Sequence, residues 1–141
     1  MTDGAFPAMG DLLPHGRGAM LLDRVKAKHA EGIEVSVSIG AGSPFLVPGN
    51  GVPAHVGLEY MAQACGAFAG LEALAHGKPV RVGYLLGTRR YRATAAWFAE
   101  GDSLDVAAHL VLPAAAMTVF ECRIAARGVT LATAQLTVYQ P

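Results

Sequence analysis

A histidine and a glutamate stand four residues apart, at positions 55 and 59, in a stretch of sequence typical of a helix. That spacing is about one helical turn, so both side chains project from one face, roughly 6 Å apart along the axis. An imidazole and a carboxylate placed this way can move protons at adjacent carbons of one bound molecule. His55 and Glu59 are therefore the first candidates for an acid–base pair.

Both residues also have structural interpretations. Glu59 could pair with a surface cation, although its neighbours Leu58, Met61 and Ala62 predict little water around it. A carboxylate in apolar surroundings needs a charged partner or stays protonated, and a general acid must be protonated. His55 could instead fill an aromatic slot in a subunit interface.

The start of the same helix offers backbone groups. The first N–H groups of a helix have no partner within it, and the helix dipole favours negative charge there. The N–H groups near Ala54 and Val56 are therefore expected to be free and to polarise a substrate carbonyl. Gln63, one turn beyond Glu59, is expected to hydrogen-bond backbone inside the fold, with substrate binding as the alternative.

One long helix and several strands must position these side chains. Residues 53–76 are rich in Ala, Leu and Met and predict a helix that is apolar on nearly every side and wrapped by other elements. Its glycines 57, 66 and 70 predict close approach by a sheet or another subunit. Before the helix, residues 12–18 predict a short helical turn, 20–28 a strand, 33–39 a half-buried strand with period-two alternation, and 43–53 an ordered loop.

Four strands are predicted after the helix, at residues 80–91, 103–112, 117–126 and 129–139, with the last two joined as a hairpin. Because the strands do not alternate with helices, the order predicts an α+β fold with an antiparallel sheet. The 141 residues fit one domain, 1–141, in which 1–10 are expected to be flexible.

The composition is 52% hydrophobic and 16% charged, which predicts that part of the surface is covered in an oligomer. Eleven basic residues balance eleven acidic ones, so no overall field favours nucleic acid or an anionic membrane. Cys65 and Cys122 lack metal or redox spacing and are expected in the core of a cytoplasmic protein. We expect no export signal, membrane span, metal or cofactor.

Several of these segments resemble, in order, those of the β-hydroxyacyl-(acyl carrier protein) dehydratases. The similar stretches are LPH at 13–15, MLLDRV at 20–25, VPA at 52–54, LEYMAQA at 58–64, TRRYR at 88–92 and GDSL at 101–104. The resemblance implies a hotdog fold, in which a curled antiparallel sheet wraps one long helix and two subunits join their sheets. It also implies removal of water from a β-hydroxyacyl thioester on an acyl carrier protein or coenzyme A, with Glu59 as the acid.

The sequence departs from that family at the catalytic histidine. The family carries it on the loop fourteen residues before the acid, which corresponds to Phe45 here. A branch associated with aryl polyene clusters has a similarly altered loop. Either His55 has taken over as the base, in one subunit or across two, or it is structural. His15, in the N-terminal motif, is expected to hold structure.

Arg89, Arg90 and Arg92, with Arg81, form the one dense basic cluster of the sequence. It is either a solvated strand edge protected by charge or a docking site for an acidic carrier protein or the phosphate of its prosthetic arm. Besides a dehydratase that forms a homodimer or larger oligomer, two alternatives remain open. One is a hotdog acyl thioesterase, and the other is a catalytically impaired hotdog subunit that binds a carrier protein.

Overall fold

The computed structural model describes residues 6–12, 20–80, 84–113 and 117–139. In chain order the elements are α1 (Met9–Leu12), β1 (Arg24–His29), β2 (Gly32–Ser38), β3 (Gly51–Pro53), the 3-10 turn η3 (Ala54–Val56), α2 (Gly57–Ala75), β4 (Tyr84–Ala93), β5 (Trp97–Ala99), β6 (Ser103–Pro113), β7 (Met117–Ala126) and β8 (Val129–Tyr139). Two residues discussed from the sequence, His15 and Arg81, lie outside the described ranges. The part of the predicted helical turn that follows Leu12 lies outside them as well.

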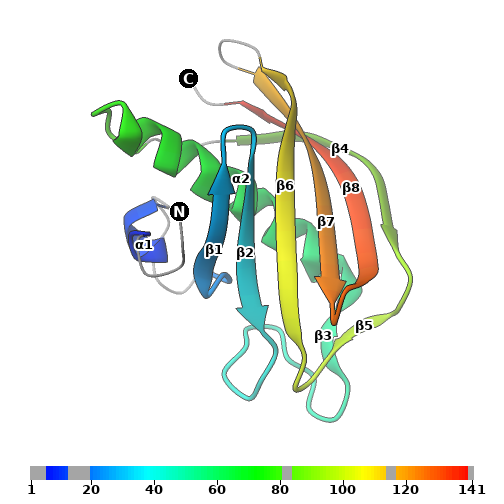
Figure 1. Cartoon of the computed structure of the whole chain (residues 1–141). Helices are drawn as coiled ribbons and strands as arrows, with labels where there is room; N and C mark the ends of the chain where they lie inside the picture. Colours follow the sequence, from blue (N-terminus) through cyan, green and yellow to red (C-terminus); the bar gives the residue numbers. More distant parts are fainter. Residues whose placement is uncertain (1–5, 13–19, 81–83, 114–116, 140–141) are drawn as a thin grey trace.

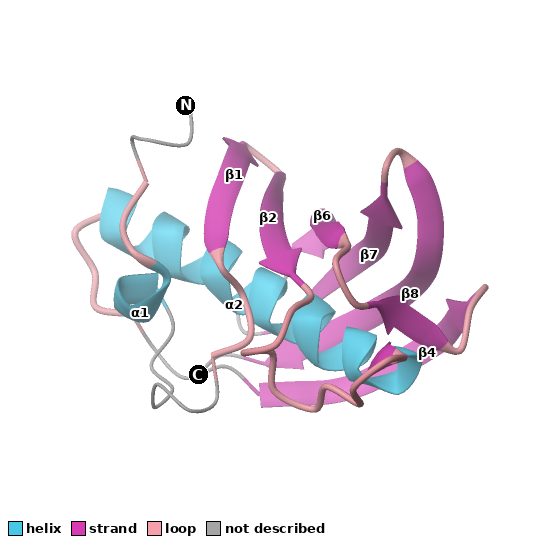
Figure 2. Ribbon diagram, turned by 90° about the horizontal axis from the view of Figure 1, so that it is seen from below, coloured by secondary structure: helices cyan, strands magenta, loops and turns pink. Residues whose placement is uncertain are grey.

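Six strands form one antiparallel sheet in the order β1-β2-β6-β7-β8-β4, which curls around α2 (Figures 1 and 2). The remaining two strands, β3 and β5, pair with each other. The predicted α+β architecture, a curled antiparallel sheet around one long helix, is therefore confirmed. β1 and β4 are the two edges of the six-stranded sheet.

The long strands follow from alternation in the sequence. On β6, Leu104 and Val106 are buried toward the helix, and Ile124 on β7 faces the same way. The β7–β8 hairpin turns at Arg127 and Gly128, whose φ angles of 51° and 76° suit a two-residue turn that matches strand twist. The bounds predicted for these two strands agree with the structure.

The helix α2 buries one side only. Tyr60, Met61, Ala64 and Phe68 lie in the core, whereas its outer side carries half-buried and exposed residues. The prediction that other elements wrap this helix on all sides is wrong for the single chain, because the sheet and α1 leave its outer side uncovered. Within the described residues, no helix is long and apolar enough to cross a membrane.

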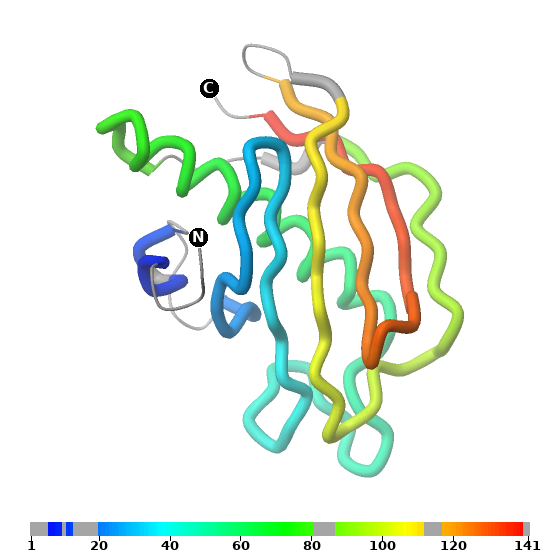
Figure 3. Tube along the Cα trace, in the orientation of Figure 1, coloured from blue at the N-terminus to red at the C-terminus, as the bar shows by residue number. Residues whose placement is uncertain are grey.

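Other elements differ at their ends. The first strand begins at Arg24 rather than at residue 20, and the long helix opens with a 3-10 turn. The short strands β3 and β5 fall in segments where no strand was expected. They bring the β2–β3 loop and the segment before β6 to the end of the molecule where α2 begins (Figure 3).

Candidate active site

The two candidate catalytic residues lie at the start of the long helix, and both are accessible to solvent. His55 is in η3 and Glu59 is in the first turn of α2, and both are exposed. A 3-10 turn rotates about 120° per residue against about 100° in an α-helix, so His55 lies farther around the axis from Glu59 than a continuous α-helix predicts. Both side chains are nevertheless exposed in the single chain.

The apolar surroundings expected for Glu59 are absent in the single chain. Met61 points into the core, while Leu58 and Ala62 are half-buried on the outer side. Residues adjacent in a helical sequence point in different directions, so apolar neighbours do not by themselves enclose a side chain. The expectation of little water around Glu59 is therefore wrong for one chain alone.

Backbone contacts hold the start of the helix. The N–H of Ala54 donates to the carbonyl oxygen of Ala96 at 2.9 Å, so the prediction that this N–H is free is wrong. The Ala54 carbonyl oxygen accepts hydrogen bonds from the N–H of Gly57 and from the hydroxyl of Tyr91 on β4. Val56 is buried, and a substrate contact by its N–H remains a prediction.

Gly57 and Gly70 are sites of close approach, as expected. A Cβ atom at Gly57 would collide with the Tyr91 hydroxyl and lie 2.9 Å from both Phe98 Cζ and Ile124 Cδ1. At Gly70 it would lie 2.5 Å from the carbonyl oxygen of Leu12. The missing side chains thus let strands and α1 pack directly against α2.

Gln63 lies on the buried side of α2, away from the exposed pair. It is only 5% exposed, and its Oε1 accepts a hydrogen bond from the N–H of Leu21 at 2.9 Å. The expected hydrogen bond to backbone is therefore confirmed.

Two tyrosines pack near the helix start. Tyr60 directly follows Glu59 and is 2% exposed, with its ring 5.9 Å from that of Phe98. Burial, with a smaller contribution from Asp23, raises the pKa of Tyr60 to about 12. Burial also raises the pKa of Tyr91. Both hydroxyls therefore stay protonated at neutral pH.

Tyr91 was not singled out by sequence reasoning. One signal for it exists: in a regular strand side chains alternate, so a tyrosine between Arg90 and Arg92 is expected on the opposite face from both arginines. Its hydrogen bond to Ala54, which is distant in sequence, has no signal in the sequence.

Phe45 occupies the loop position at which the β-hydroxyacyl-(acyl carrier protein) dehydratases carry their catalytic histidine, and it lies within the described residues. Phe45 is 62% exposed and has a φ of 68°, a left-handed conformation that is costly for a residue other than glycine. Val47, on the same loop, is exposed as well. An exposed apolar side chain thus occupies the position of the catalytic histidine in the family that the sequence resembles.

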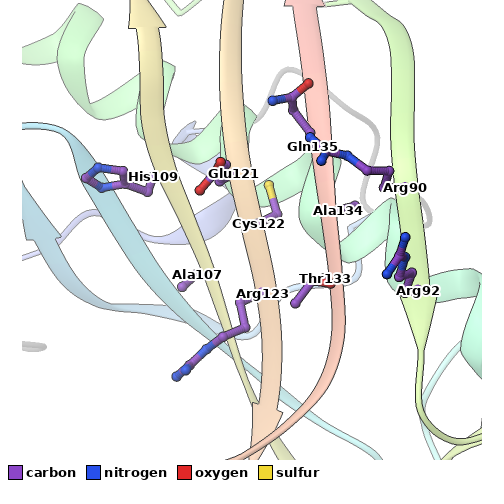
Figure 4. Close-up of a pocket in the computed structure, with 10 residues that line it drawn as sticks. All are labelled: Arg90, Arg92, Ala107, His109, Glu121, Cys122, Arg123, Thr133, Ala134 and Gln135. Atoms are coloured by element: carbon purple, nitrogen blue, oxygen red, sulfur yellow. The ribbon is translucent and has the colours of Figure 1, made fainter.

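A basic hollow lies on the outer face of the sheet, opposite α2 (Figure 4). It measures about 570 Å³ and is lined by Arg90, Arg92, Ala107, His109, Glu121, Cys122, Arg123, Thr133, Ala134 and Gln135. Arg90 and Arg92 come from β4 and Arg123 from β7, and Glu121 is the one carboxylate among these lining residues. Arg89 is exposed but does not line it.

These three arginines take part in none of the ion pairs found among the described residues. Those pairs are Lys26–Glu34, Lys26–Asp105, Lys28–Glu72 and Arg127–Asp102. The structure therefore joins two arginines of the predicted cluster to Arg123, which sequence reasoning missed because it belongs to another strand. The hollow carries an excess of positive charge.

Comparisons with known proteins identify the family to which the chain belongs. A model of ApeP-like proteins, described as ApeP dehydratase, matches residues 7–141. A chain of the dehydratase heterocomplex ApeI:P from Xenorhabdus doucetiae is 30% identical, with a TM-score of 0.92 over 96% of this chain and 92% of that one. Among curated proteins, none matches the sequence significantly.

More distant solved structures share only the fold. A hypothetical thioesterase with coenzyme A from Streptococcus pneumoniae TIGR4 is 13% identical, with a TM-score of 0.65 over 84% of each chain. The Escherichia coli PaaI protein from the phenylacetic acid degradation operon is 12% identical, with a TM-score of 0.63 over 82% of this chain and 80% of that one. The chain belongs to the ApeP-like dehydratase family and has the hotdog fold.

Proposed function

We propose that the protein dehydrates a β-hydroxyacyl thioester, carried by an acyl carrier protein or coenzyme A, to the trans-2-enoyl thioester. His55 takes the α-proton, and Glu59 in its protonated form gives its proton to the departing β-hydroxyl group. The Cα–H and Cβ–O bonds break, the double bond forms, and water leaves. The observation that carries this proposal is the shared exposure of His55 and Glu59 at one helix start of a dehydratase-family chain.

We propose that a second hotdog subunit completes this site. Proton transfer of this kind is favoured where water is excluded, yet both side chains are exposed in the single chain. The outer side of α2 also carries half-buried Leu58, Ala62 and Ala69, which a packed partner would cover. β4 is a ten-residue edge strand whose outer edge can pair with a partner's strand.

The second subunit is either another copy, giving the expected homodimer or a larger oligomer, or a different hotdog chain. The ApeI:P structure is a heterocomplex, which supports the second possibility. Native mass spectrometry of the purified chain, alone and with a candidate partner subunit, distinguishes them. A chain that stays monomeric in both samples would contradict a shared site.

The basic hollow is our proposed docking surface for the acidic carrier protein. Arg90, Arg92 and Arg123 supply three guanidinium groups from two strands, and planar guanidinium groups bind carboxylates in pairs of hydrogen bonds. Arg89, exposed beside the hollow, belongs to the same proposed surface. Self-repulsion among these cations favours an anionic partner.

Substrates with and without a carrier protein test this surface. Arg123→Gln is expected to raise KM at least about threefold for a carrier-protein thioester and to leave KM for an uncharged pantetheine thioester unchanged. The matched control is Arg127→Gln, which removes an exposed arginine outside the hollow. Arg127 lies in the β7–β8 turn, where it pairs with Asp102. Equal KM changes for both substrates would exclude the hollow as a carrier site.

Phe45 favours a second candidate function, a partner subunit without its own catalysis. An apolar residue stands where the resembling family has its histidine. This candidate predicts that activity appears only with a partner subunit and survives His55→Ala and Glu59→Gln in this chain. Release of free thiol, rather than gain of enoyl absorbance, would instead identify a thioesterase.

The cysteines support a cytoplasmic location, which we also propose. Cys65 and Cys122 are free and buried, with their Sγ atoms 3.7 Å apart, as expected for core residues. Unbridged cysteine pairs are typical of reducing compartments.

A further inference from the structure

We infer that Tyr91 is a positioning residue that orients His55, an inference that rests on the proposed role of His55 as the base. The Tyr91 hydroxyl donates a hydrogen bond to the carbonyl oxygen of Ala54, the residue directly before His55. Tyr91 belongs to strand β4 and His55 to the helix start, so the contact joins two elements far apart in the chain.

The geometry of the peptide group explains how this contact reaches His55. The Ala54 carbonyl and the His55 nitrogen belong to one planar unit. A donor that fixes the carbonyl direction therefore also fixes the direction in which the chain enters His55. The Ala54 N–H is held independently by the carbonyl oxygen of Ala96, at 2.9 Å. The residue before the proposed base is thus restrained on both sides.

Strand β4 has a bulge next to Tyr91, whose side chain points toward the helix start. Arg89 pairs with Gln135 and Arg92 with Thr133, so β4 has one more residue than β8 between these pairs. Arg90, within the bulge, has a φ of 55°, a left-handed conformation that costs free energy in a non-glycine residue. Arg90 and Arg92 line the outer hollow, while the Tyr91 hydroxyl reaches the helix start on the other side.

Gly57 completes this arrangement. Its missing side chain leaves the space occupied by the Tyr91 hydroxyl, and a Cβ atom there would collide with it. Burial raises the pKa of Tyr91, which keeps the hydroxyl protonated as a donor at the pH of an enzyme assay. The Gly57 N–H also donates to the Ala54 carbonyl oxygen, so loss of the tyrosine hydroxyl changes its direction without leaving it unpaired.

The test compares Tyr91→Phe with Tyr139→Phe in the complete chain, with any partner subunit that activity requires. Tyr139 is the last described residue of β8, so its variant removes a hydroxyl far from the helix start. For Tyr91→Phe we expect kcat to fall roughly 5- to 100-fold with KM within about twofold, because small misplacement of a reacting group slows chemistry more than binding. Tyr139→Phe is expected to leave both unchanged.

A second readout separates positioning from the proposed reaction. In ¹³C-labelled protein, the ring resonances of His55, assigned with His55→Ala, are expected to shift in Tyr91→Phe and not in Tyr139→Phe. If the His55 resonances shift in Tyr91→Phe but the original protein shows no dehydratase activity, the proposed function is wrong. The inference that Tyr91 orients His55 would still hold in that case. Unchanged resonances together with kcat within twofold of the original protein would overturn the inference.

A subtler substitution covers the case in which Tyr91→Phe does not fold. Site-specific 3-fluorotyrosine at position 91 keeps the ring and the hydroxyl but makes the hydroxyl a stronger donor. It is expected to shift the His55 ring resonances, and 3-fluorotyrosine at position 139 is expected to leave them in place. A result in which both labelled proteins match the original spectrum would overturn the inference as well.

Discussion

His55 on η3 and Glu59 on α2 are both exposed at the helix start, while the residue directly after Glu59, Tyr60, is only 2% exposed. Around the start of α2, the side chain of Glu59 therefore belongs to the exposed surface and that of Tyr60 to the core. Substitution of Tyr60 should change the free energy of unfolding, whereas substitution of Glu59 should change catalysis.

Gly57→Ala should destabilise the fold although alanine is the better helix former. The helix gains up to about 1 kcal/mol in propensity, but overpacking against Tyr91, Phe98 and Ile124 costs about 1–3 kcal/mol. The free energy of unfolding, measured by urea denaturation, should fall by about 1–2 kcal/mol. Gly42→Ala, with no atom within 4 Å of its new Cβ, is the control. Equal effects of the two substitutions would contradict the packing described at Gly57.

Gln63→Met should destabilise the protein by about 1–3 kcal/mol, because it leaves the buried N–H of Leu21 without its side-chain acceptor. Methionine has a similar shape, so little of the loss comes from volume. Leu58→Met, on the half-buried outer side of the same helix, should cost less than about 1.5 kcal/mol. If the Leu58 variant proves the less stable of the two in denaturation experiments, the hydrogen bond is not what Gln63 contributes.

Tyr60 should give the fold a dependence on alkaline pH. Its pKa is about 12 in the folded protein against 10.0 for an ordinary tyrosine, so between these values only the unfolded chain loses the proton. The stabilisation is complete below pH 10 and is lost as the pH rises through 12, a change on the order of 2–3 kcal/mol. Denaturation at several pH values should show that the free energy of unfolding falls less steeply between pH 10 and 12 in Tyr60→Phe than in Tyr139→Phe. Identical slopes would argue against this assignment.

Arg90→Gly should be more stable than Arg90→Ala by about 1 kcal/mol. Both variants remove the same guanidinium group, but only glycine adopts the φ of 55° at this position without strain. Thermal or chemical denaturation of the two variants measures the difference directly. An alanine variant as stable as the glycine variant would mean that the bulge is not maintained in solution.

Local patterns predicted most of the fold. The bounds of β7 and β8 follow from period-two alternation around Arg127-Gly128, and α2 follows from a run of good helix formers. β5 is only three residues long, too short for any period to emerge. Its pairing with β3 depends on contacts between distant segments, which a local pattern does not contain.

The candidate site was predicted less completely, for two physical reasons. Sequence proximity to Met61 suggested apolar surroundings for Glu59, yet the helix turns these two side chains in different directions. The acceptor for the Ala54 N–H comes from Ala96, and the hydroxyl on the Ala54 carbonyl comes from Tyr91. Both contacts are made only once the chain has folded.

The most direct test of the proposed reaction is the rate of enoyl thioester formation, followed by absorbance on a β-hydroxyacyl thioester, for Glu59→Gln against Glu31→Gln. Glu31 is an exposed residue in the β1–β2 turn and provides a matched loss of one carboxylate. If Glu59 is the general acid, its variant should lose at least about 100-fold in kcat while the control keeps its rate. A Glu59→Gln protein that dehydrates the substrate as fast as the control would contradict the proposed mechanism.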